Sequence, residues 1–167
     1  MADLWGNWED AYAYPLRVHE GRTSFDLLDG FYLYHEVEAL LRGGEERIAR
    51  EEVRRFAQHA EVNERERIAY LRSLAVLSEW EGDIKRAIDR LHEARVLAEK
   101  IGLPKELWQI QSKAGELYER RGEAEEAREA FSRAAQTLRK LAQKIEDEEL
   151  REGFLSSPQA RRVLERS

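Results

Sequence analysis

Histidine is the first residue type to test for chemistry, because it can serve as a metal ligand or as a general base. The four histidines, His19, His35, His59 and His92, are scattered singly along the chain. The His-Glu-Val-Glu segment that begins at His35 lacks the second histidine that a zinc-protease helix requires. The sequence therefore predicts no metal site.

Other arrangements typical of catalysis are also missing from the sequence. The chain contains no cysteine, which excludes a thiolate nucleophile and a disulfide framework. Gly43 and Gly44 are not followed by the Lys-Ser or Lys-Thr of a phosphate-binding loop. The acidic run 146–149 cannot converge on a cation, since consecutive helical residues point in different directions. No two carboxylates stand where their surroundings would give them different pKa values, so the sequence offers no candidate pair for general acid–base catalysis. We expect a protein that is not an enzyme and holds no cofactor.

Residues 107–141 carry the clearest structural pattern, that of two helices folded against each other. Gly122 separates the helices, at a turn that favours a residue without a Cβ atom. Apolar residues recur at helical spacing on both sides of this glycine, so that each helix has one apolar face. These residues are Ile110, Ala114, Leu117, Tyr118, Ala124, Ala127, Phe131, Ala134, Leu138 and Leu141.

A Gly-x-x-x-x-Ala signature indicates that this hairpin is repeated along the chain. Its glycines are Gly6, Gly44, Gly82 and Gly122, and an alanine stands five residues after each. Successive glycines are 38, 38 and 40 residues apart. A nearly constant period of this length is typical of stacked helical repeats.

The hairpin resembles a tetratricopeptide repeat. That family has small, aromatic, Ala, aromatic and Ala residues in a fixed order, matched here by Gly115, Tyr118, Ala127, Phe131 and Ala134. The resemblance implies an all-α fold, a right-handed superhelix of antiparallel helix pairs with a C-terminal capping helix. We expect one domain over 1–167, with a half repeat at 4–21, repeats at about 25–60, 64–102 and 104–145, and a cap at 147–166.

Local signals predict where several helices begin and end. A Pro or Gly next to a capping residue is informative, because it stops one helix or starts the next. The last helix of the third full repeat is expected to run through Ile145. Boundaries are predicted at Asn63 with Glu66, at Asp83, at Gly102 with Pro104, and at Ser157 with Pro158.

In the tetratricopeptide family the functional surface is a concave groove lined by the first helix of each repeat. The resemblance therefore implies a groove that binds a peptide or helix of a partner protein. Two other interpretations remain open: Trp80 could fill the core where Ser78 replaces the usual aromatic, and the cations could make only surface ion pairs. The groove positions are Tyr34, His35, Glu38, Arg72, Val76, Trp80, Lys113, Glu116 and Arg120.

The sequence begins in the middle of a repeat. We therefore expect an apolar surface at this N-terminal end that another segment or molecule must cover. Trp5 and Trp8 lie in this half repeat and are candidates for self-association, giving a homodimer. An architectural role through this end is therefore an alternative to groove binding. A small-molecule sensor pocket between helices is another, although no residue pattern favours it.

The closing segment IEDEELREGFLSSPQARRVLE resembles the end of C-terminal repeat arrays in large bacterial signalling proteins. Examples are transcriptional activators of the STAND ATPase class and cyclase-linked regulators. The resemblance implies a role in bacterial signalling or transcriptional regulation, without the ATPase.

Charge and hydropathy limit the classes of partner. The formal net charge of −6 disfavours nucleic acid and anionic membrane surfaces as partners. No apolar run approaches the roughly 20 residues that span a bilayer, and the N-terminus does not resemble a signal peptide. We expect a cytoplasmic protein whose partner is a protein or peptide.

Overall fold

A computed structural model describes residues 33–167, and these residues form α-helices joined by turns, with no strand among them. The all-α class predicted from the sequence is confirmed. The chain divides into two compact units between Arg90 and Leu91, within the helix α5 (Ile84–Ile101). One domain over 1–167 stays a prediction. The helices are α2 (Leu33–Arg42), α3 (Glu46–Ala60), α4 (Glu64–Trp80), α5 (Ile84–Ile101), α6 (Pro104–Arg121), α7 (Ala124–Ala142), α8 (Glu148–Ser156) and α9 (Pro158–Glu165).

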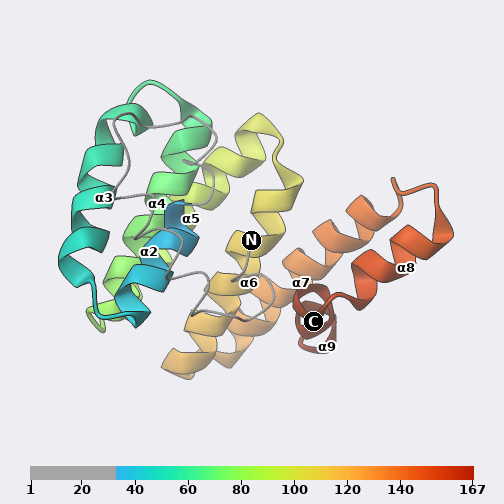
Figure 1. Ribbon diagram of the computed structural model, residues 1–167. Coiled ribbons are helices and arrows are strands. Elements are labelled where there is room, and N and C mark those ends of the chain that lie inside the picture. The colour runs from blue at the N-terminus through green and yellow to red at the C-terminus, as the bar shows by residue number, and fades with distance from the viewer. Residues whose placement is uncertain (1–32) are drawn as a thin grey trace. The chain divides into compact units, whose positions relative to one another are not determined.

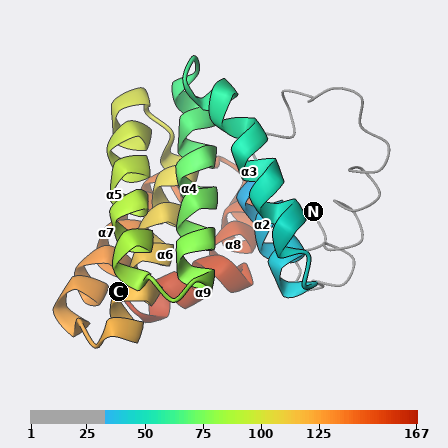
Figure 2. The same ribbon diagram turned by 90° about the vertical axis from the view of Figure 1, so that its left-hand side faces the viewer.

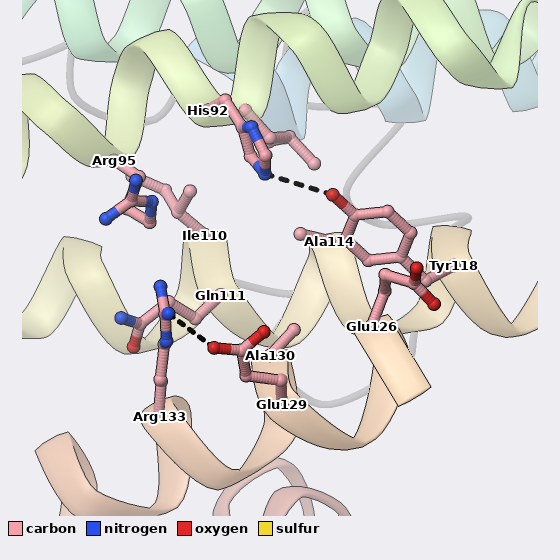
Figure 3. Close-up of a pocket in the computed structure, with 11 residues that line it drawn as sticks. His92, Arg95, Ile110, Gln111, Ala114, Tyr118, Glu126, Glu129, Ala130 and Arg133 are labelled. Carbon is pink, nitrogen blue, oxygen red and sulfur yellow. Dashed lines mark hydrogen bonds and ion pairs between the residues drawn. The ribbon is translucent and has the colours of Figure 1, made fainter. Parts of the chain in front are cut away.

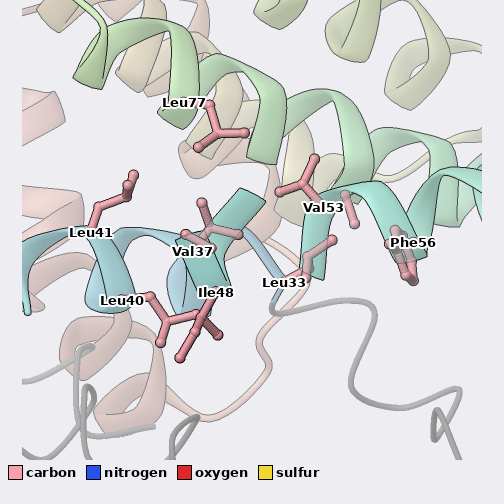
Figure 4. Packing of buried hydrophobic residues seen from close by; sticks show 10 residues of the cluster. Leu33, Val37, Leu40, Leu41, Ile48, Val53, Phe56 and Leu77 are labelled. Carbon is pink, nitrogen blue, oxygen red and sulfur yellow. The ribbon is translucent and has the colours of Figure 1, made fainter. Parts of the chain in front are cut away.

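In the first unit, the helices α2, α3 and α4 pack against one another around one apolar cluster (Figures 2 and 4). Val37 of α2 and Phe56 of α3 are almost completely buried in this cluster. The apolar residues Leu33, Val37, Leu40, Ala49, Val53, Phe56 and Ala60 are all buried.

In the second unit, α6 and α7 form a tight antiparallel hairpin (Figure 1). Gly115 allows the close approach, because a Cβ atom placed on it would lie 2.9 Å from the ring of Phe131. Phe131 is buried together with the small residues Ala127 and Ala134. Two residues of the sequence pattern, Gly115 and Phe131, therefore pack closely across this hairpin.

The C-terminal helices α8 and α9 cover α7, as Figure 1 shows. Ala160 and Val163 of α9 are buried in a cluster with Leu138 of α7 and Trp108 of α6. The predicted capping segment therefore seals an apolar face of the second unit.

One predicted boundary is wrong. Instead of running through Ile145, α7 ends at Ala142, and backbone N–H groups of residues 143–145 close a turn. The separate helix α8 begins after Asp147, whose carboxylate accepts a hydrogen bond from the Leu150 N–H at 2.9 Å. The acidic residues at the start of α8 thus lie where the positive end of the helix dipole favours them.

The turns at Gly44, Gly82 and Gly122 have the same local geometry. Each glycine has a positive φ, between 77° and 84°. In each turn the next residue donates its backbone N–H to the carbonyl four residues before the glycine, at 2.8–3.0 Å. This pattern satisfies carbonyls at the helix end, and a residue with a Cβ atom would be strained at the glycine. At these three glycines the Gly-x-x-x-x-Ala signature therefore coincides with one repeated turn.

The predicted caps are present at the following helix starts. The Asn63 side chain accepts from the Arg65 N–H at 2.9 Å, and its amide donates to Glu66 at 3.2 Å. Asp83 accepts from the Arg86 N–H at 3.0 Å. Pro104 begins α6, and Ser157 precedes Pro158 at the start of α9. No helix among the described residues is long and apolar enough to cross a membrane.

Candidate functional site

A cleft in the second unit lies between α5 and α7, with α6 as its floor (Figure 3). Its volume is about 220 Å³. The helix α5 contributes Leu91, His92 and Arg95; α6 contributes Ile110, Gln111, Ala114 and Tyr118; and α7 contributes Glu126, Glu129, Ala130 and Arg133.

The middle of the cleft is apolar and lined by small side chains. Ala114 of α6 and Ala130 of α7 present only a methyl group each, while Leu91 and Ile110 are buried behind them. Short side chains at these positions leave a space that longer ones would fill. The cleft therefore results from residue size on two neighbouring helices.

One end of the cleft is bounded by His92 and Tyr118. His92 Nε2 and the Tyr118 hydroxyl share a hydrogen bond of 3.1 Å, which joins α5 to α6. The Glu126 carboxylate of α7 lies at this same end (Figure 3). This end therefore combines a hydrogen-bonded aromatic pair with a negative charge.

The other end of the cleft carries Arg95, Gln111 and Arg133 (Figure 3). Arg95 pairs with Glu99 of its own helix at 2.7 Å, and Arg133 pairs with Glu129 at 2.5 Å. Between these arginines, Gln111 is 5% exposed and accepts a long hydrogen bond of 3.4 Å from Thr137. This end therefore presents two guanidinium groups and a primary amide, all of them hydrogen-bond donors.

In the first unit, the predicted groove residues of α2 and α4 contact one another. Arg72 is 8% exposed, and its guanidinium lies 3.5 Å from the centre of the Tyr34 ring. The Tyr34 and His35 rings are 3.9 Å apart, and Glu38 pairs with Arg42 at 2.6 Å. The cation–π contact holds Arg72 between two helices. The alternative interpretation that the cations make only surface ion pairs is therefore wrong for Arg72.

Val76 and Trp80 of α4 have different surroundings. Val76 is partly buried against the apolar cluster of the first unit. Trp80 is 51% exposed, whereas Ser78 is buried, so Trp80 does not fill the core in place of the missing aromatic. That alternative interpretation of Trp80 is wrong, because a residue two positions farther along a helix points to another side.

Trp80 belongs to a polar network that joins α3 to α4. Arg50 of α3 pairs with Glu46 and with Glu81, both at 2.7 Å. The hydrogen bond from Arg50, its positive charge and a smaller contribution from Trp80 lower the pKa of Glu46. The two carboxylates raise the pKa of Arg50. Trp80 therefore contacts the α3–α4 network.

In the second unit, the predicted groove positions Lys113, Glu116 and Arg120 lie on α6. Lys113 and Glu116 are 3.8 Å apart, and Arg120 is exposed. Arg166, just after α9, lies 3.9 Å from Glu116 and 3.6 Å from Glu119. The C-terminal segment therefore already contacts this face of α6.

Trp5 and Trp8, the predicted self-association residues, lie outside the residues that the structure describes. Self-association through them stays a prediction. Within residues 33–167, no group of three His, Asp or Glu side chains is placed to hold a metal ion.

No binding role was predicted for the residues at the two ends of the cleft, although His92 and Tyr118 stand out in the sequence. His92, Arg95, Glu126 and Arg133 lie on second helices of the predicted pairs, whereas the family resemblance directs attention to the first helices. A useful signal was the seven-residue spacing of Glu126 and Arg133, which places opposite charges on one face of α7 with Ala130 between them.

The chain matches no protein-family model, no curated protein and no solved structure.

Proposed function

We propose that this chain is a non-enzymatic interaction module that binds a peptide or helix of a partner protein, and that the cleft between α5 and α7 anchors the partner. The observation that carries this proposal is the combination of an apolar middle and polar ends within one cleft. Such a lining buries an apolar side chain while hydrogen bonds orient its neighbours.

The size of the cleft supports a peptide side chain as its occupant. Pockets for drug-sized molecules usually measure about 300–1,000 Å³, whereas this cleft measures about 220 Å³. That volume accommodates one or two side chains, with the partner backbone outside. A partner segment that contributes a few anchoring side chains therefore fits better than a large enclosed ligand.

Contacts elsewhere favour this cleft over the groove positions predicted from the sequence. On α6, Arg166 reaches Glu116 and Glu119, so a ligand on that face would compete with the C-terminal segment. On α4, Arg72 is engaged by Tyr34. At the cleft, by contrast, Arg95 and Arg133 pair with glutamates on their own helices and leave space between the helices.

We further propose that the helical hairpins are tetratricopeptide-like repeats within a right-handed superhelix. The repeated glycine turns support this assignment, as does the contact between Gly115 and Phe131. A place in bacterial signalling or transcriptional regulation rests on the resemblance of the closing segment alone.

Selection from a displayed library of random peptides, with the full chain immobilised, tests the interaction-module proposal. We expect enriched peptides that bind the wild type and lose at least tenfold in affinity for Ala130→Arg, because the long side chain fills the cleft. Gln136→Arg, at an exposed position of α7 outside the cleft, is the matched control and should bind normally.

Other results of this selection would contradict the proposal. Peptides that bind wild type and Ala130→Arg equally would exclude the cleft as their site. A lack of peptide binding, together with thermal stabilisation by a small metabolite, would support the sensor alternative instead. Circular dichroism of both variants establishes that they are folded before binding is compared.

A further inference from the structure

The geometry points to a specific partner chemistry for the cleft: a helix that presents an acidic side chain, an apolar side chain and a basic side chain on one face, at positions i, i+3 or i+4, and i+7. This inference rests on the proposed function and specifies which segment the cleft selects. The acidic side chain would lie at the Arg95 and Arg133 end, and the basic one at the Glu126 end.

The lining residues of α6 and α7 form three levels along the cleft. The helices α6 and α7 are antiparallel about Gly122, and Figure 3 shows lining residues of both helices beside each other along the cleft. The levels are Tyr118 with Glu126, Ala114 with Ala130, and Gln111 with Arg133. Their spacings along each helix, three or four residues, equal about one helical turn. A ligand helix with the same spacing therefore meets all three levels with one face.

The end with Arg95, Gln111 and Arg133 is suited to a carboxylate. Gln111 is almost fully buried and uses its carbonyl oxygen for Thr137, which leaves its NH₂ group as a donor at the cleft. The Arg133–Glu129 pair has side chains 49% and 64% exposed, so solvent screens it strongly. An incoming carboxylate that buries this end would gain hydrogen bonds from the arginines and the amide.

The opposite end is suited to a basic side chain. Glu126 is exposed and takes part in none of the ion pairs that join the described residues. The nearest acid along the cleft, Glu129, is engaged by Arg133. The separation of Glu126 and Arg133, seven residues, corresponds to about 10 Å along α7. Opposite charges two turns apart on the ligand helix would match this separation.

Four designed helical peptides of the same length test the inference. They carry Glu-Leu-Lys, Glu-Leu-Glu, Lys-Leu-Lys or Gln-Leu-Gln at the three anchoring positions, with alanine-rich sequence elsewhere, and binding is measured by fluorescence anisotropy. The wild type should bind the Glu-Leu-Lys peptide most tightly, by about tenfold over the others. A fifth peptide with the reversed order, Lys-Leu-Glu, is added because a helix can enter the cleft in either direction.

Charge reversal at each end should change the preference in a defined way. Arg133→Glu should make Lys-Leu-Lys the preferred peptide, and Glu126→Lys should make Glu-Leu-Glu the preferred peptide. Arg128→Glu and Glu125→Lys are matched controls, because these residues form an exposed ion pair of α7 outside the cleft lining. Both controls should keep the wild-type preference.

Three outcomes would overturn the inference and are distinguishable from failure of the proposed function. Equal binding of all peptides, with Ala130→Arg still blocking them, would leave a peptide cleft without charge selection. Peptide preferences that do not change as expected in Arg133→Glu and Glu126→Lys would also indicate a peptide cleft without charge selection. If no designed peptide binds while library peptides bind at the cleft, the inference fails and the proposed function stands.

Discussion

The α2–α4 contact of the first unit and the α5–α7 cleft of the second use the same kinds of side chain in opposite ways. In the first unit, Arg72 of α4 lies on Tyr34 of α2, so the cation joins two helices. At the cleft, Arg95 and Arg133 each pair with a glutamate of their own helix. A pair that crosses between helices closes the space between them, whereas a pair within one helix leaves that space open for a ligand.

The largest expected effect concerns the large aromatic side chains buried in each unit. Phe131→Ala should lower the free energy of unfolding by about 3–5 kcal/mol, because it leaves a cavity between α6 and α7. Phe56→Ala in the first unit should cost a similar amount, since Phe56 is equally buried. Denaturant unfolding measures both. Loss of peptide binding in folded Phe56→Ala would contradict the assignment of the cleft to the second unit.

A smaller effect distinguishes side-chain pairs that join two helices from ion pairs within one helix. Tyr34→Leu should destabilise the chain by about 1–2 kcal/mol, because it removes the cation–π contact of a nearly buried arginine. Arg133→Gln should cost less than about 1 kcal/mol, since its ion pair is exposed. Thermal and denaturant unfolding of the two variants compare them. Equal losses of stability in the two variants would contradict the difference between the closed α2–α4 contact and the open cleft.

The glycine turns should respond alike in the two units. Gly82→Ala and Gly122→Ala should each cost about 1–2 kcal/mol, because alanine is strained at positive φ although no atom lies within 4 Å of the added Cβ. Gly153→Ala is the control, since Gly153 lies in α8 with open space around it and should not destabilise. A difference of more than about 1 kcal/mol between the two turn variants would contradict their equivalence.

The smallest effect concerns the pH dependence of the α3–α4 network. The Arg50 hydrogen bond and charge hold the pKa of Glu46 below its usual 4.5, so ionised Glu46 stabilises the fold above that value. This contribution is lost as pH falls through the lowered pKa, because protonated Glu46 no longer binds Arg50 as an anion. NMR titration should show the pKa of Glu46 returning towards 4.5 in Arg50→Gln. An unchanged pKa in that variant would exclude Arg50 as the cause.

Much of the fold was predictable because it depends on local rules. Asn63, Asp83 and Pro104 set helix ends through their own side chains, so their effects are visible in the sequence. The end of α7 was not predicted, because apolar Ile145 continues the helical pattern although the chain turns before it. Trp80 was also ambiguous, since only its position at the end of α4 leaves it half exposed beside α3.

The candidate site was predictable only in part. The family resemblance identified groove positions on the first helices of the predicted pairs. In the structure, Arg72 and Tyr34 at two of these positions contact each other. Nothing in the sequence shows that Arg166 reaches Glu116, because that contact joins residues far apart along the chain. The cleft was not predicted for the same reason.

The sequence by itself determined the all-α class, the apolar face of each helix and the glycine turns, because helical periodicity and backbone sterics act over a few residues. Only the tertiary structure decided where the cleft lies. Its lining requires α5, α6 and α7 to be side by side, with Ala114 and Ala130 in the middle and Arg95 and Arg133 at one end. Whether an arginine closes a surface or lines an opening depends on which helix carries its partner, and that is settled only when the helices pack.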